Sequence, residues 1–180
     1  MIESYQTGDY VYLYTNNQHN LYDQGLITHL WGIFGLLLAF IVILFLAKKY
    51  PKIGIILIVA FLLRSSIAIV DYIWTGVLPD TLLDSALYES YAWDFASGTF
   101  TQMKESYAFR NTSFIIVNLY SYIYYFIGYR SVLFLQSIGI LLGTLIVFIS
   151  WKISLIVWKN DIIAKNSAWL VALYPSLILY

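Results

Sequence analysis

Long apolar runs separated by short polar segments account for most of this chain. The first run, 30–47, has no charged residue, and 18 residues of helix at 1.5 Å each reach about 27 Å, enough to cross the hydrocarbon core of a bilayer. Three further runs occupy 53–74, 132–151 and 162–180. The pattern predicts an all-α, polytopic transmembrane protein with about four spans in a membrane domain of residues 30–180.

One other apolar run, 114–127, is too short for the same interpretation. Its 14 residues include Asn118, Ser121 and four tyrosines. A run of this length lies at the membrane interface, or re-enters, more often than it crosses. We therefore expect a juxtamembrane helix over 113–128.

Two lysine-rich connections indicate the orientation. They contain Lys48, Lys49 and Lys52, and Lys152, Lys159 and Lys165. The positive-inside rule places both connections in the cytoplasm and the Lys- and Arg-free tail 1–29 outside. Two crossings then bring 75–112 back outside as an external loop. The return to the cytoplasm at Lys152 needs an odd number of crossings, so either 114–127 or 132–151 does not cross, and the shorter segment is the better candidate. We expect a multi-pass protein of a cell membrane, the bacterial plasma membrane, with its N-terminus outside.

Composition agrees with the membrane class and excludes several others. Of the 180 residues 61% are hydrophobic and 11% charged, whereas soluble domains carry about 25% charged residues. The formal net charge of zero gives no attraction to nucleic acid. Cysteine is absent, and His19 and His29 have no acidic cluster between them, so neither a metal site nor a cofactor is expected. Membrane lipid is the expected partner.

The external loop 75–112 carries the candidate chemistry. At 100° per residue of helix, Asp84, Tyr88, Tyr91 and Phe95 fall within about 60° of one another. A carboxylate at the end of an aromatic stripe suits a sugar or a membrane surface. We assign Asp84 as a candidate general base or acceptor anchor and Tyr88 as a candidate substrate contact.

A structural interpretation of the same residues is equally open. Thr81 can be the N-cap of a helix in which Asp84 stands at N3, as in a capping box, with Gly98 as the C-terminal stop. The two roles of Asp84 are compatible. Glu89 and Asp94 are the alternative acidic site residues.

Three basic residues are candidate substrate contacts. Arg64 lies within a span, where a charge costs about 2.5–3.5 kcal/mol on insertion scales, so it either pairs with Asp71 or another helix or shapes a polar cavity. The pairing is the favoured alternative. Lys104 and Arg110 end the external loop and can hold a lipid phosphate, or can snorkel as ordinary juxtamembrane bases.

The order of these features resembles the GT-C class of polytopic glycosyltransferases, nearest to the branch of protein O-mannosyltransferases and bacterial lipid A aminoarabinose transferases. The resemblance covers about residues 55–180. The matching pieces are Arg64, Asp84-x-x-x-Tyr88-x-x-x-Ala92-x-x-x-Ala96-x-Gly98, Arg110, an aromatic stretch from Leu119 to Gly128, Gly139 and Gly143, a basic hinge from Lys152 to Lys165, and Ala172-Leu173-Tyr174-Pro175-Ser176.

The resemblance implies an external active site. Asp84 would activate or orient the acceptor hydroxyl, and Arg110 would lie near the phosphate of a polyprenyl-phosphate sugar donor, with inversion at the anomeric carbon. Such chemistry needs a base, a phosphate clamp and alignment of the reacting atoms.

The chain departs from the family pattern at several points. Asp84 is followed by Ser85 where many members have a second acid, no Pro follows Arg110, and the span 30–47 precedes the usual first span. Family members are also much longer, and the last apolar run stops at Tyr180. We therefore expect an N-terminal fragment that is inactive without a missing C-terminal membrane region.

The sequence leaves two other functions open. One is a non-catalytic accessory or remnant membrane protein. The other is a component of a polysaccharide polymerase or flippase system, which also places an external loop between spans. A carboxylate on an aromatic helix face favours the glycosyltransferase.

Overall fold

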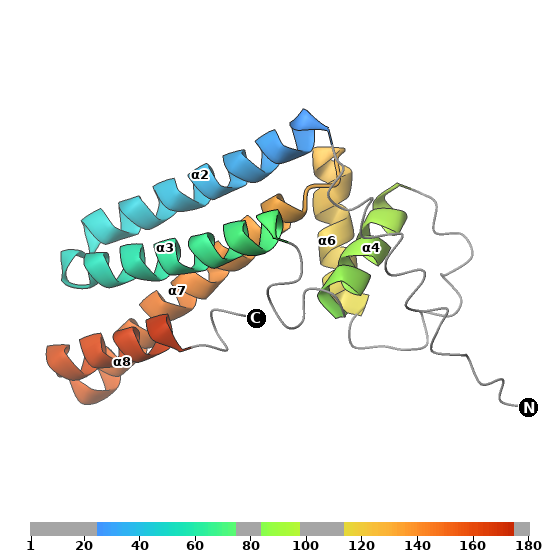
Figure 1. Cartoon of the computed structure of the whole chain (residues 1–180). Helices are drawn as coiled ribbons and strands as arrows, with labels where there is room; N and C mark the ends of the chain where they lie inside the picture. The colour runs from blue at the N-terminus through green and yellow to red at the C-terminus, as the bar shows by residue number, and fades with distance from the viewer. Residues whose placement is uncertain (1–24, 75–83, 98–113, 175–180) are drawn as a thin grey trace, which may run out of the picture. The chain divides into compact units, whose positions relative to one another are not determined.

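The computed structural model describes residues 25–74, 84–97 and 114–174, and in these ranges regular structure is entirely helical, without a strand (Figure 1). The helices are α2 (Leu26–Lys49), α3 (Pro51–Ile73), α4 (Asp84–Ala96), α6 (Phe114–Ile127), α7 (Val132–Trp158) and α8 (Asp161–Leu173). The all-α prediction is confirmed for this part of the chain.

Three helices of the described ranges are long and apolar enough to cross a membrane. They are α2, α3 and α7, with 24, 23 and 27 residues. Helices over 30–47, 53–74 and 132–151 are thereby confirmed, although α7 continues to Trp158. Most of this extension is apolar and exposed, although Ser154 is buried. Lys152 is exposed too, so a single charge on a long side chain does not end the helix. These helices indicate a membrane protein.

The chain divides into two compact units. Unit 1 comprises residues 1–30 and 82–132, and therefore contains α4 and α6. Unit 2 comprises 31–81 and 133–180, and contains α3, α8 and most of α2 and α7.

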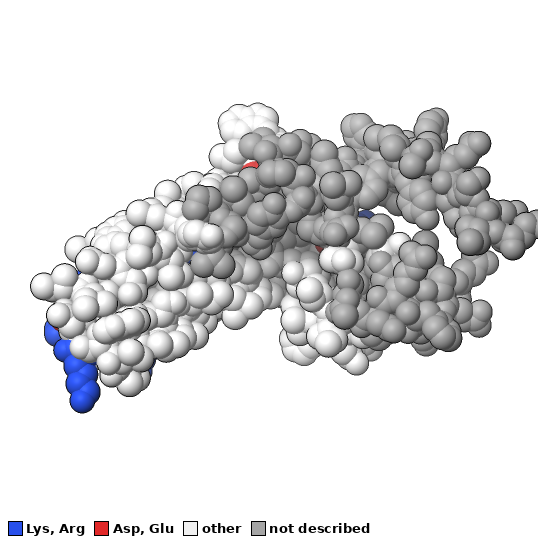
Figure 2. Space-filling view, turned by 90° about the horizontal axis from the view of Figure 1, so that it is seen from below, with Lys and Arg blue, Asp and Glu red and all other residues white. Residues whose placement is uncertain are grey.

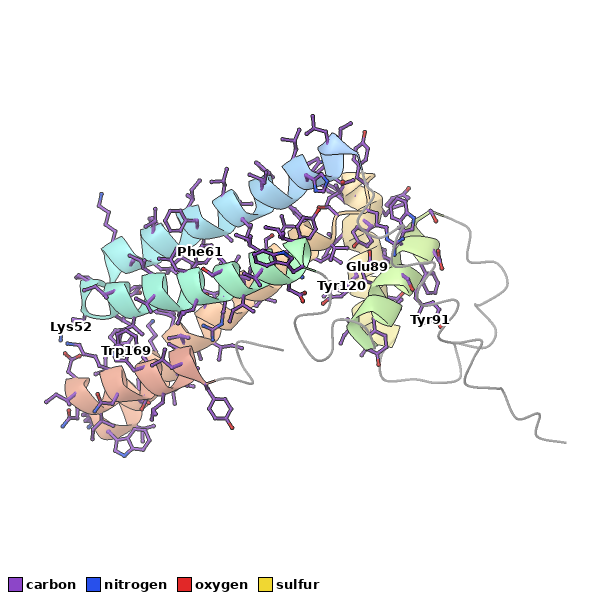
Figure 3. The ribbon with its side chains drawn as sticks, viewed as in Figure 1. Lys52, Phe61, Glu89, Tyr91, Tyr120 and Trp169 are labelled. Carbon is purple, nitrogen blue, oxygen red and sulfur yellow. The ribbon has the colours of Figure 1, made fainter. Side chains whose placement is uncertain are left out.

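Helix α3 forms the centre of unit 2. Ile53, Leu57 and Ala60 on α3 are fully buried, and the ring of Phe61 lies 5.4 Å from the ring of Phe40 on α2 (Figure 3). Helix α8 packs on α3 through a stripe of alanines, Ala164, Ala168 and Ala172, each without exposed surface. Small side chains at this spacing let two helix backbones approach closely, as is common between membrane helices.

Glycine also permits a close approach of α2 to α7 within unit 2. A Cβ atom built on Gly32 would lie 2.6 Å from the Cβ of Leu133, which real side chains do not allow. Near this contact, the ring of Trp31 meets that of Phe134 edge to face at 6.1 Å. The close packing of α2 on α7 at this point therefore depends on the fit of glycine and of aromatic side chains.

A two-residue connection joins α7 to α8. Lys159 adopts a left-handed conformation, φ 50°, and its N–H donates to the Leu155 carbonyl at 3.0 Å. The Asn160 side chain then caps α8 by accepting from the backbone N–H groups of Ile162 and Ile163 at 2.9 and 3.3 Å. The expected hinge of Lys152 to Lys165 is therefore helical except at these two residues.

The expected fourth span, 162–180, is described only in part. Helix α8 covers Asp161–Leu173, while residues 175–180 lie outside the described ranges. The number of four spans stays a prediction.

Candidate functional site

The helix expected in the loop is present as α4, and it packs on α6 within unit 1. The short run 114–127 forms α6 with the expected bounds. The face of α4 that is buried contains Glu89 and Ala92, at 5% and 0% exposure. Figure 3 shows Glu89 on the side of α4 toward α6 and Tyr91 on the side away from it.

A buried ion pair joins α4 to the turn that follows α6. Arg130 follows α6, and its Nε and Nη2 donate to the two carboxylate oxygens of Glu89 at 2.9 and 2.6 Å. The Glu89 side chain is 6% exposed and that of Arg130 is 14% exposed. This two-point geometry is the strong form of an arginine–carboxylate contact.

Tyr124 completes what we call the Glu89 cluster, made of Glu89, Tyr124 and Arg130. The Tyr124 hydroxyl donates to Oε1 of Glu89 at 2.5 Å, and the side chain is fully buried. The ring of Trp93, on α4, meets the Tyr124 ring edge to face at 5.7 Å. Both oxygens of Glu89 therefore accept hydrogen bonds, and the rings of Trp93 and Tyr124 pack together beside them.

The turn after α6 places Arg130. Gly128 has φ +76°, a conformation that only glycine adopts easily, and its N–H donates to the Tyr124 carbonyl at 2.8 Å. Ser131 then donates its hydroxyl hydrogen to the Thr28 carbonyl at 2.8 Å. Arg130 is therefore held between a helix cap and a second anchor.

The electrostatics of the cluster keep its protons in place. Burial, and then the charge and hydrogen bond of Glu89, raise the pKa of the Tyr124 hydroxyl well above its usual value. Burial lowers the pKa of Arg130, but the hydrogen bond and charge of Glu89 outweigh this and raise it. Tyr124 thus remains a neutral donor and Arg130 a cation.

Asp94 is a second carboxyl group, and its pKa responds to the charges of Arg130 and Glu89. Burial raises its pKa, the charge of Arg130 opposes this rise, and the charge of Glu89 adds to it. Asp94 holds its proton more readily than an exposed aspartate does. A general base must offer a lone pair to a proton. Both oxygens of Glu89 already accept hydrogen bonds from Arg130 or Tyr124, so they are poor candidates for that role. The cluster instead holds α4 in position.

Most of the sequence-predicted site residues are not brought together by the described structure. Asp84 is the first residue of α4, but its side chain is outside the description, as is Thr81, its expected cap. Tyr88 lies half-buried on α4. Lys104 and Arg110 lie outside the described residues.

Arg64 is placed clearly, in unit 2, with 4% exposure. Its Nη1 donates to the carbonyls of Ala60 at 3.1 Å and Ala172 at 3.4 Å, and its Nη2 donates to Val171 at 3.4 Å. A Cβ on Gly143 would lie 3.0 Å from Nε of Arg64, so this glycine leaves room for the guanidinium. The pairing with another helix matches these bonds, and substrate binding by Arg64 stays a prediction.

Sequence reasoning did not single out Arg130 and Tyr124. A signal existed, because Arg130 is the only charged residue between Arg110 and Lys152. An isolated arginine beside an apolar helix needs a carboxylate, and the stretch between α3 and α6 contains five of the chain's ten acidic residues. Glu89 was considered only as a replacement for Asp84. Among the described residues no group of three or more potential metal ligands occurs.

Comparisons with known protein families, curated proteins and solved structures find no match to this chain. The fold itself indicates a helical membrane protein whose sequence carries, between two span-length helices, a pair of short helices joined by a buried ion pair.

Proposed function

We propose that this chain belongs to a membrane glycosyltransferase that moves a sugar from a polyprenyl-phosphate donor to an acceptor on the outer face of the membrane. The acting part is the segment between α3 and α7, with Asp84 as general base. The chain is a multi-pass protein of the bacterial plasma membrane, and its N-terminus is external.

The observation that carries the proposal is the Glu89 cluster. A loop that only connects two spans needs no buried ion pair, whereas Glu89 and Arg130 hold α4 on α6 in one arrangement. Catalytic groups require such a rigid support, since a small misplacement lowers the rate strongly. An acid-bearing helix followed by a short aromatic helix ending in Gly128 is also the order of the GT-C resemblance.

The contacts of the acidic residues favour Asp84 as the base. Both oxygens of Glu89 accept hydrogen bonds from Arg130 or Tyr124. Burial raises the pKa of Asp94, so a smaller fraction of this carboxyl than of an exposed aspartate is ionised and able to accept a proton at a given pH. Asp84 begins α4, where the positive end of the helix dipole stabilises a carboxylate.

The proposed reaction is a single displacement. The acceptor hydroxyl oxygen attacks the anomeric carbon and gives its proton to Asp84, while the bond from that carbon to the phosphate oxygen breaks. The leaving polyprenyl phosphate keeps the electron pair, and Lys104 and Arg110 offset its charge. Tyr88 and Arg64 complete the proposed substrate contacts.

The test uses membranes that contain the whole gene product and three radiolabelled donors, the polyprenyl phosphates of mannose, glucose and aminoarabinose. Turnover of one donor is expected, and Asp84→Asn is expected to lower it by about 10²–10⁴-fold, the usual contribution of a general base. Asp94→Asn is the matched control on the same helix and is expected to retain turnover.

Two results would contradict this mechanism. Full turnover in Asp84→Asn would remove the assigned base. No turnover of any donor by the folded protein would favour a non-catalytic accessory or remnant protein, or a polymerase or flippase component.

A further inference from the structure

One end of unit 2 contains six of the seven lysine and arginine residues of that unit. The turn between α2 and α3, the last turns of α7 and the first turn of α8 meet this end, and Figure 2 shows basic side chains protruding there beside an almost uncharged surface. We call this group the lysine end. Its members are Lys48, Lys49, Lys52, Lys152, Lys159 and Lys165. With Asp161 as the one acid in residues 48–52 and 152–165, six lysines leave a net charge of +5.

The lysines of this end fall into different environments. Lys52 and Lys165 both reach Oδ2 of Asp161, at 3.3 and 3.5 Å. Lys49 and Lys152 instead approach one aromatic ring, that of Tyr50, with their Nζ atoms 5.7 and 5.6 Å from its centroid. Both cations therefore lie around one ring, and their positive charges attract an anion to this part of the surface.

The ring between these lysines is fixed by its neighbours. The Tyr50 centroid lies 5.0 Å from that of Phe148 and 6.0 Å from that of Trp151, which is 5% exposed. Lys152 also lies 5.5 Å from the Phe148 ring centroid. The aromatic packing therefore fixes the position of the ring that both lysines approach.

The surface beside these lysines is apolar and exposed. On α2, Phe45 is 65% exposed, and on α7, Ile153 and Ile156 are 55% and 72% exposed. A free phosphate ion gains no binding energy from an apolar surface. A phospholipid does, because it has acyl chains as well as a phosphate. Basic clusters directly beside membrane helices bind anionic lipids by this combination.

We propose that Lys49 and Lys152, arranged around Tyr50, form a binding site for the phosphate headgroup of an anionic phospholipid. The apolar sides of α2 and α7 receive the acyl chains. This site does not depend on the proposed glycosyl transfer, and it would operate in an accessory protein as well.

The test measures lipid retention by native mass spectrometry of the full chain released from nanodiscs of phosphatidylcholine and phosphatidylglycerol in equal parts. The wild-type chain is expected to retain phosphatidylglycerol preferentially. A lysine near an anionic surface contributes about fivefold in binding, so Lys49→Gln/Lys152→Gln should reduce retention at least about tenfold. Lys49→Arg/Lys152→Arg should restore the preference.

The matched control is Lys52→Gln/Lys165→Gln, which removes the same charge from the same end and should leave most of the retention. Equal losses in both double variants would overturn the site, because binding would then follow total charge. Displacement of the lipid by millimolar inorganic phosphate would also overturn it in favour of a free-anion site, as would a wild-type chain without preference between the two lipids.

Discussion

Arg130 and Glu89, 41 positions apart in the chain, meet through two parallel hydrogen bonds from Nε and Nη2 to the two carboxylate oxygens. Both side chains are largely buried, so neither charge has water as an alternative partner. The arrangement makes the contact selective, because only a guanidinium presents two donors in this fork.

Arg130→Met should therefore detach α4 from α6. It leaves the Glu89 carboxylate buried without its cation, at a cost of about 3–5 kcal/mol. Hydrogen exchange of the α4 amides in detergent micelles would measure the loss. The double variant Glu89→Gln/Arg130→Met should recover much of the protection. If the effects of Glu89→Gln and Arg130→Met simply add, the two residues do not form the coupled pair described here.

The stability of unit 1 should decrease as pH rises through the mildly acidic range. The pKa of Asp94 is raised by burial, with opposition from Arg130 and a further rise from Glu89. The folded state therefore binds the proton more tightly than the unfolded state, whose value is about 3.9. This contribution is complete below the unfolded value and is lost as pH rises through the folded value.

Asp94→Asn should flatten this dependence and stabilise the unit at neutral pH, because the variant has no carboxyl to ionise. Thermal unfolding of both proteins across the mildly acidic to neutral range is the measurement. Parallel pH profiles for wild type and variant would show that Asp94 titrates alike in the folded and unfolded states.

Two glycines offer a matched test of backbone conformation. Neither Gly128 nor Gly139 has an atom within 4 Å of the position of an added Cβ. Gly128 has φ +76°, whereas Gly139 lies within α7. Gly128→Ala should destabilise by about 1–2 kcal/mol, and Gly139→Ala should stabilise by about 0.5–1 kcal/mol in thermal unfolding. Equal effects would mean that the turn after α6 does not need a left-handed residue.

The proposed orientation can be tested in this cysteine-free chain. Ser97 and Lys48 are both exposed, at the end of α4 and near the end of α2. A thiol reagent that does not cross membranes should label Ser97→Cys in intact cells and Lys48→Cys only after permeabilisation. The reverse pattern would place the lysine end outside.

The helices could be predicted because each depends on local composition. Apolar runs long enough to span, and a short aromatic run before Gly128, indicated α2, α3, α6 and most of α7. The predicted span ends at residue 151 because Lys152 follows it, whereas α7 continues to Trp158.

The contacts of Glu89 and Arg64 could not be predicted in the same way. Each joins residues far apart in sequence, and the pattern on either helix alone does not specify the partner. The stripe from Asp84 to Phe95 illustrates the difficulty: it drew attention to Tyr88 and Tyr91, while the neighbouring face with Glu89 and Ala92 is the one that is buried.

The contact of Arg64 with the end of α8 has a consequence for the carbonyl groups of that helix end. Thirteen residues of α8 extend about 20 Å from Asp161, less than the roughly 30 Å of a hydrocarbon core. Arg64 lies the same thirteen residues beyond Pro51 along α3, and so reaches the same level. The last four carbonyl groups of an α-helix have no partner within the helix and need a donor from elsewhere. By donating to the carbonyls of Val171 and Ala172, Arg64 of α3 supplies that donor, so the C-terminal end of α8 is satisfied by a neighbouring helix rather than by its own backbone.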